Sequence, residues 1–140
     1  MQKVMVFGTF DGLHEGHKSF FRQAKKLGGY LTVIVARDNF VEKAKGHLPG
    51  RSQKTRVSDI RKTKLADKAL LGSRTYNFYQ TIRTHKPNLI ALGYDQKPAI
   101  NSLKKDLKKH RLRNIKIVRL RPYKSDIFKS SKLNRGNINY

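Results

Sequence analysis

The sequence contains no cysteine, and no apolar run approaches the roughly 18 residues that a membrane-spanning helix requires. Without cysteine, neither a disulfide framework nor a thiolate metal site can form. No basic segment followed by an apolar one opens the chain, as it does in a secretory signal. These absences lead us to expect a cytoplasmic protein that makes no contact with a membrane.

Acidic residues are also scarce, with 9 Asp and Glu against 32 Lys and Arg, for a formal net charge of +23. A surface of this kind attracts polyanions. A nucleic-acid-binding module is one hypothesis, although none of the familiar nucleic-acid motifs is present. Binding of nucleotides or phosphorylated metabolites is a second hypothesis, and a solvated basic surface without a dedicated partner is a third.

The length of 140 residues suits a single domain over residues 1–140. Apolar β-branched runs alternate with stretches of helical periodicity. Strands are predicted at residues 4–7, 30–36, 68–72, 88–93 and 115–120, helices at residues 18–27, 53–64, 76–85 and 98–110, and a loop at residues 37–51. Such alternation predicts one α/β domain of the doubly wound, Rossmann-like type, with a five-stranded parallel sheet.

Ligands of doubly wound sheets bind outside the carboxyl ends of the strands, so the residues that follow each strand matter most. The first strand is followed by GTFDGLHEGH, which runs from Gly8 to His17. His14 and His17 are three residues apart and are expected on one face of the first helical turn, where each can donate a hydrogen bond to phosphate. Gly16 lets phosphate approach the backbone, and the start of the helix is expected to offer free N–H groups and a positive dipole end.

This ten-residue string resembles the first motif of the cytidylyltransferase-like nucleotidyltransferases, which carry HxGH. Two further stretches, VIVARD (residues 33–38) and ALGYDQ (residues 91–96), look like the archaeal FAD synthetase branch, and DKALLGS (residues 67–73) fits it too. That branch transfers AMP from ATP to FMN. Glycerol-3-phosphate cytidylyltransferases share the first motif but usually carry Trp where this chain has Gln96, which favours the adenylyltransferase.

The resemblance implies a role for individual residues. The resemblance assigns catalysis to His14, His17 and Lys43. It assigns nucleotide binding to Thr9, Phe10, His14, Gly16, His17, Asp95, Ser130 and Ser131. The acceptor phosphate is assigned to Lys43, Lys45, Lys124 and Ser125. Asp95 is expected at the nucleotide ribose, and Arg56 is a candidate for the arginine of the family's E/Q-x-R segment.

The C-terminal tail departs from the family pattern R-T-x-G-[IV]-S-[ST]-[ST]. Residues 124–131 align with it, but Lys124 replaces Arg and loses the bidentate fork, and Lys129 stands where Ser is usual. Ser130 and Ser131 keep hydroxyls suited to phosphate. Because this tail normally shapes substrate choice, the acceptor is the part of the function that the sequence defines least.

A divalent cation, most simply Mg²⁺, is implied by ATP as substrate and can be held by the substrate's own phosphates. Asp11 is a candidate outer-shell contributor. A zinc site at His14 and His17 has no evident third ligand nearby, so no protein metal site is predicted. The predicted partners are ATP and FMN, with CTP and glycerol 3-phosphate as the alternative pair, and the family suggests a homodimer. Phe20 and Phe21 are predicted core residues, whereas Tyr123 and Phe128 are candidates for contact with the isoalloxazine ring.

Overall fold

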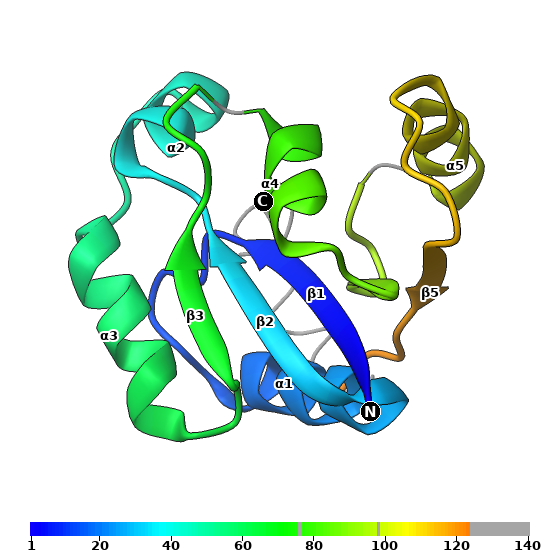
Figure 1. The fold of residues 1–140 in the computed structure, drawn as a ribbon. Helices are drawn as coiled ribbons and strands as arrows, with labels where there is room; N and C mark the ends of the chain where they lie inside the picture. The colour runs from blue at the N-terminus through cyan, green and yellow to red at the C-terminus, as the bar shows by residue number, and fades with distance from the viewer. Residues whose placement is uncertain (76, 98, 124–140) are drawn as a thin grey trace.

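The computed structural model describes residues 1–75, 77–97 and 99–123 and shows a single parallel sheet with helices on both faces (Figure 1). The elements in chain order are β1 (Gln2–Gly8), α1 (Glu15–Gly28), β2 (Gly29–Val35), α2 (Asp38–Lys45), α3 (Gln53–Thr63), β3 (Lys68–Leu71), α4 (Phe78–His85), β4 (Leu89–Leu92), α5 (Ile100–Lys109) and β5 (Lys116–Arg119). The sheet order is β3-β2-β1-β4-β5 with all neighbours parallel, which confirms the predicted doubly wound fold.

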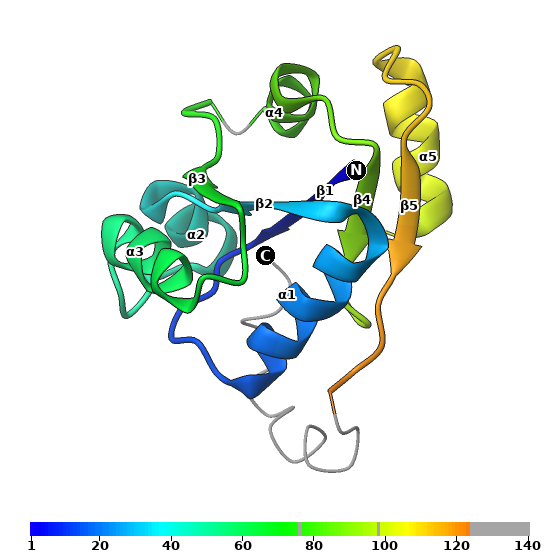
Figure 2. The same cartoon turned by 60° about the horizontal axis from the view of Figure 1, so that its bottom comes forward.

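Alternating side chains of β1 build the core on the two faces of the sheet. Val4 and Val6 pack with side chains of α1 and α3, whereas Met5 and Phe7 pack with side chains of α4 and α5. Figure 2 shows the same layering, with α1 and α3 on one side of the strands and α4 and α5 on the other. Because a strand points successive side chains to opposite faces, a continuous apolar run was the correct signature of a doubly covered strand.

The sequence prediction was wrong about residues 37–51, where the structure has helix α2 in place of a continuous loop. Val41 anchors this short helix in the core at 2% exposure, and Gly46 ends it in the left-handed conformation. Its N-cap, Arg37, makes no side-chain cap; instead the side chain of Gln53 accepts a hydrogen bond from the Asp38 N–H at 2.8 Å. A cap supplied from another helix leaves no local sequence signal, which explains the missed element.

The sheet opens between β1 and β4. The chain adds β2 and β3 on one side of β1 and then continues with β4 and β5 on its other side. All seven residues of β1 pair with β2, but only Val4 and Met5 pair with β4. Beyond Met5 the ladder between β1 and β4 ends, so these two strands leave a crevice toward their carboxyl ends. In open α/β sheets this switch point is where ligands bind, and it lies directly beside the GTFDGLHEGH segment.

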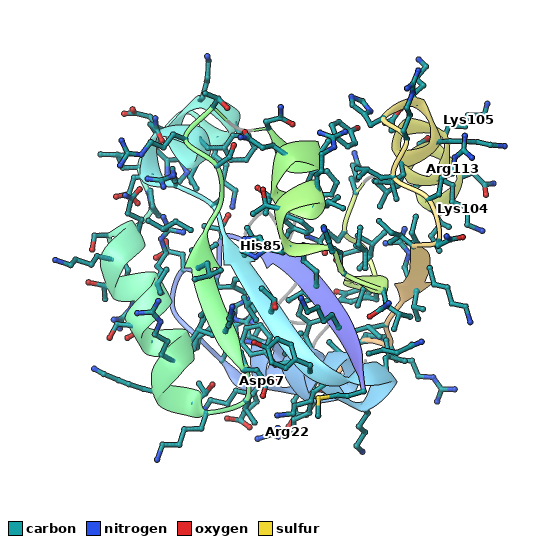
Figure 3. The ribbon with its side chains drawn as sticks, in the orientation of Figure 1. Arg22, Asp67, His85, Lys104, Lys105 and Arg113 are labelled. Carbon is teal, nitrogen blue, oxygen red and sulfur yellow. The ribbon has the colours of Figure 1, made fainter. Side chains whose placement is uncertain are left out.

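The basic stretch from α5 to β5 lies at one end of the sheet. Lys104, Lys105 and Arg113 are exposed and project outward around α5 (Figure 3). Within the described ranges no helix combines the length and the apolar character needed to cross a membrane.

Candidate nucleotide-binding site

The turn after β1 depends on close packing between Gly8 and Phe10. Phe10 has a positive φ of 53°, and its ring folds back so that a Cβ on Gly8 would lie only 2.5 Å from it. The buried Phe10 ring meets His17 edge-on at 5.5 Å and Phe21 at 5.1 Å between ring centroids. Gly8 therefore allows the tight turn that brings the end of β1 against the start of α1.

His14 and His17 form a reciprocal cap at the start of α1. Nδ1 of His14 accepts hydrogen bonds from the N–H groups of Gly16 at 3.0 Å and His17 at 3.4 Å. Nδ1 of His17 accepts from the N–H of His14 at 3.4 Å, and the two rings stack at 3.8 Å. Because a backbone N–H can only donate, both Nδ1 atoms are unprotonated, and each neutral ring carries its proton on Nε2.

The surroundings keep both imidazoles neutral. Burial lowers the pKa of His17 from 6.5 to about 3, and the adjacent His14 adds to that shift. Burial also lowers the pKa of His14, although the carboxylate of Glu15 opposes the change. At neutral pH the pair therefore offers two Nε2–H donors of fixed tautomer and no positive charge.

This cap corrects one expectation drawn from the sequence. The N–H groups of Gly16 and His17 were expected to be free for phosphate, but the His14 ring occupies both of them. The N–H of Lys18 bonds the His14 carbonyl oxygen, as in an ordinary helix. The imidazole donors and the helix dipole, rather than these backbone N–H groups, are what α1 presents to an anion.

A small cavity opens beside the His17 ring at the crevice between β1 and β4, and His14 is not among its lining residues. Its lining includes Thr9, Phe10, Gly16, His17 and Phe20 on one side and Gly93, Tyr94, Arg121 and Tyr123 on the other. The buried Oγ1 of Thr9 and Oδ1 of Asp95 have no hydrogen-bond partner among the described residues. Thr9 lines the cavity, so its unpaired Oγ1 is suited to a ligand there, because buried polar atoms are normally paired. Asp95 follows β4 but does not line this cavity.

Arg56 ties together the loops that surround this site, and its side chain is fully buried. Its guanidinium donates to the carbonyl oxygen of Thr9 at 2.8 Å, to that of Arg51 at 3.0 Å and to Asp38 Oδ1 at 2.7 Å. The planar fork of arginine can serve three acceptors at once, which lysine cannot do. Arg56 thus fixes the chain after β1, the start of α2 and the start of α3 relative to one another.

Asp11 performs a similar task for the loop that follows α2. Its two carboxylate oxygens accept from the N–H groups of Gly50 at 2.7 Å and Arg51 at 2.8 Å. Burial lowers the pKa of Lys45; the charge of Asp11 opposes that shift and the charge of Arg56 adds to it. Lys45 is half-buried and interacts with Asp11 and Arg56, whereas Lys43 is exposed on the same helix.

Several predicted site residues lie outside the described part of the chain. These are Lys124, Ser125, Phe128, Ser130 and Ser131. The structure describes the start of the tail. There the side-chain amide of Gln23 forms two hydrogen bonds with the backbone of Arg121. The Arg121 N–H donates to Gln23 Oε1 at 3.0 Å, and Gln23 Nε2 donates to the Arg121 carbonyl oxygen at 3.0 Å. The tail therefore starts at the mouth of the His17 cavity.

Comparison with known proteins identifies the family. The family model described as Cytidylyltransferase-like matches residues 5–135. The chain belongs to this family. It is 39% identical over 132 residues to a FAD synthase of Thermococcus sibiricus, spanning 94% of this chain and 88% of the relative. It is 40% identical over 123 residues to a FAD synthase of Aciduliprofundum boonei, spanning 88% and 80% of the two chains.

A solved structure extends the agreement to three dimensions. The chain is similar to a Thermoplasma volcanium protein described as a lipopolysaccharide core biosynthesis protein, with a TM-score of 0.81 and 37% identity over 88% of this chain and 98% of that one. The resemblance that the sequence motifs suggested is thereby confirmed, both for the cytidylyltransferase-like family and for its FAD synthetase branch.

Gln96 is the site residue whose role sequence reasoning missed. Its buried amide donates from Nε2 to the Phe7 carbonyl oxygen at 2.8 Å and accepts the Gly93 N–H on Oε1 at 3.0 Å. It thereby bridges β1 and the end of β4 where their ladder has ended. The sequence treated Gln96 only as a marker that separates members of the cytidylyltransferase-like family; its bridging role depends on a contact across 89 residues.

Two carboxylates near the site already have partners. Asp11 accepts hydrogen bonds from two backbone N–H groups, and Asp38 forms an ion pair with Arg56. Asp95 is separated from both of them in the sequence. Over the described ranges, His, Cys, Asp and Glu form no group of three that could hold a metal ion. A cation brought in on the phosphates of a nucleotide is compatible with this arrangement, because Mg²⁺ commonly relies on substrate phosphates and water.

Proposed function

We propose that this protein is an FMN adenylyltransferase, which makes FAD and pyrophosphate from ATP and FMN. The observation that carries the proposal is the pair of capped, neutral histidines at the switch point of the sheet. The same conclusion is supported by the family and by relatives named FAD synthase at about 40% identity over most of the chain.

The reaction needs a nucleophile, a leaving group and stabilisation of charge. An oxygen of the FMN phosphate forms a bond to the α-phosphorus of ATP, and the bond from that phosphorus to the bridging oxygen of pyrophosphate breaks. The FMN phosphate is already an anion at neutral pH, so no general base is required. The protein therefore acts mainly by positioning the two phosphates and by donating hydrogen bonds to the charge that develops in the transition state.

The structure suggests how this chain supplies those hydrogen bonds. His14 and His17 offer Nε2–H donors of fixed direction to the phosphates of ATP, and their neutrality spares the site the cost of burying extra charge. Thr9 and Asp95 offer unpaired buried oxygens, which we assign to the nucleotide, with Asp95 at the ribose. Positive charge for the phosphates comes from Lys45 near the site and, in our proposal, from Lys43 and Lys124.

ATP enters as its Mg²⁺ complex, and the cation is then part of the substrate. We assign no protein ligand to it, because the candidate carboxylate, Asp11, uses both of its oxygens to hold the loop at Gly50 and Arg51. The tail beyond Tyr123, with Ser125, Ser130 and Ser131, is proposed to complete the phosphate and nucleotide contacts. One domain over residues 1–140 and assembly as a homodimer stay predictions.

Product formation under matched conditions tests the proposal. Purified protein is incubated with Mg²⁺ and either ATP plus FMN or CTP plus glycerol 3-phosphate, and the products are separated by chromatography. We expect FAD and an equal amount of pyrophosphate from the first pair only. A protein that makes CDP-glycerol and no FAD would be a cytidylyltransferase of the same family.

A His17→Asn variant provides the control for the site. It should bind ATP but lose most of its turnover, because a hydrogen-bond donor to the transition state is removed. Undiminished turnover in this variant would contradict the assigned role of His17. The separate nucleic-acid hypothesis predicts tight binding of DNA or RNA that weakens steeply as the salt concentration rises, and a titration at several salt concentrations tests it.

A further inference from the structure

The cavity beside His17 lacks positive charge from its imidazole. A nucleoside triphosphate is strongly anionic, whereas His17 is neutral at neutral pH because burial lowers its pKa to about 3. Among the described residues that line this cavity, Arg121 is the one that carries a positive charge, and Lys43 and Lys45 are not part of the lining. Because an anion in a partly buried site is costly without a counter-charge, Arg121 is the candidate partner for the phosphates.

The backbone of Arg121 is held by a side chain of α1. The pairing of β5 with β4 continues to Leu120, whose N–H donates to the Leu92 carbonyl oxygen at 2.8 Å. At the next residue, the Arg121 N–H donates to Gln23 Oε1 at 3.0 Å, and Gln23 Nε2 donates to the Arg121 carbonyl oxygen at 3.0 Å. Since a carboxamide has the same donor and acceptor as a peptide group, Gln23 takes the place of a neighbouring strand.

The amide of Gln23 has a defined orientation. A backbone N–H can only donate and a carbonyl oxygen can only accept, so the two bonds to Arg121 fix which end of the amide is Oε1. Gln23 is half-buried, and its Nε2 also donates to Ser19 Oγ at 3.3 Å, one turn earlier on α1. The same helix carries His17 in its first turn. One rigid element therefore sets the position of Arg121 relative to the imidazole donor.

Two other arginines near the strand ends hold backbone atoms. Nη1 of Arg119 donates to the carbonyl oxygens of Gly93 at 2.8 Å and Gln96 at 2.6 Å. Arg56 is fully buried and serves the loops around the site. Arg121, in contrast, is exposed and forms no ion pair within the described part of the chain. Its guanidinium can thus turn its planar fork to a phosphate, which accepts such a fork through two oxygens.

We propose that the Arg121 guanidinium binds the triphosphate of the nucleotide in the cavity beside His17, and that Gln23 is the positioning residue that holds Arg121 there. This inference rests on the proposed function. It adds to the site a cation and an anchor that lie outside the sequence motifs described above.

Five variants test the two roles. Arg121→Gln removes the charge, Arg121→Lys keeps the charge without the fork, and Gln23→Leu removes both hydrogen bonds but keeps a side chain of similar size. Arg22→Gln is the charge control, because Arg22 is exposed on the same helix (Figure 3). Gln80→Leu makes the matched amide-to-alkyl change at an exposed position of α4.

Steady-state kinetics with ATP and FMN measures the effects. We expect the KM for ATP to rise about tenfold in Arg121→Gln and about threefold in Gln23→Leu, with kcat and the KM for FMN within about twofold of wild type, because uniform binding of the triphosphate is lost. Arg121→Lys should lie between wild type and Arg121→Gln, and both controls should behave like the wild type. The double variant of Gln23→Leu and Arg121→Gln should match Arg121→Gln alone, since Gln23 acts through Arg121.

Equilibrium dialysis with ATP and with adenosine, which has no phosphate, tests what Arg121 contacts. Arg121→Gln should weaken the binding of ATP and leave that of adenosine unchanged. Wild-type affinity for ATP in this variant, or equal weakening of both ligands, would overturn the phosphate contact. Additive effects in the double variant would overturn the positioning role of Gln23.

The proposed function can fail separately. A wild-type protein that makes CDP-glycerol and no FAD would overturn the proposed function. In that case Arg121→Gln should raise the Kd for CTP, and the inference about Arg121 would stand. If Gln23→Leu fails to fold by circular dichroism, Gln23→Ala takes its place in the same measurements.

Discussion

The neutral state of His17 gives the protein a dependence of stability on pH that one substitution should remove. His17→Asn is the chosen change, because the Asn Oδ1 lies near the position of the imidazole Nδ1. It can keep the hydrogen bond from the His14 N–H but cannot take up a proton. His14 stays in both proteins, so the difference between wild type and variant isolates His17.

The sign follows from proton binding in the two states. In the unfolded chain His17 titrates at its ordinary value of 6.5, whereas burial and His14 hold its pKa at about 3 in the folded protein. Between these values the unfolded state binds a proton that the folded state does not bind, so stability rises with pH. The contribution is fully present above pH 6.5 and is lost progressively as the pH falls toward 3.

The magnitude follows from the same two values. With 8% of the residue exposed, His17 needs little discount for solvent screening. Linkage gives a loss of about 2 kcal/mol in the unfolding free energy between pH 7.5 and pH 5. The variant should lack this loss, so the difference in unfolding free energy between wild type and variant should shrink, or change sign, as the pH falls.

Urea unfolding followed by circular dichroism at several pH values measures this difference. His47→Gln, at an exposed position, controls for the loss of an imidazole from the surface. If the wild-type and His17→Asn stabilities change in parallel from pH 7.5 to pH 5, then His17 is not held neutral by its surroundings. The assignment of its proton to Nε2 would then lose its support.

Three further substitutions test the packing around the site. Gly8→Ala should lower the unfolding free energy by roughly 1–3 kcal/mol, because its Cβ would lie 2.5 Å from the Phe10 ring; an unchanged melting temperature would contradict that packing. Arg56→Met should cost about 3 kcal/mol in urea unfolding, near the low end for a broken buried pair because Asp38 is partly exposed, and adding Asp38→Asn should recover part of it. Gln96→Glu should be less stable than wild type by roughly 1–3 kcal/mol, since a carboxylate would face the backbone carbonyl oxygen that the amide now bonds; equal stability of the two proteins would refute the bridge.

The order of the elements and the place of the nucleotide site could be predicted from local sequence alone. Strand β2 has a β-branched run, and α1 has apolar residues at helical spacing and glycines at its end; such periods arise from backbone geometry and need no tertiary contact. The GTFDGLHEGH string follows the first strand, and the topology of alternating strands and helices places it at the switch point. The amino-acid sequence is therefore sufficient to single out His14 and His17 as candidate site residues, and their roles stay predictions.

Other features were decided only in the folded chain, because they depend on contacts between distant residues. Helix α2 receives its cap from Gln53, and the tautomers of His14 and His17 follow from hydrogen bonds that occupy the N–H groups expected to be free. Arg56 and Gln96 have roles that exist only where several strand ends converge. A cavity of about 270 Å³ between the carboxyl ends of the central strands and helices α2 and α4 is the clearest case, since its lining comes from segments between Phe7 and Leu103 that meet only through packing. The sequence determined the type of reaction through one contiguous motif, whereas the cavities exist only in the folded chain, because their linings come from segments that are distant in sequence.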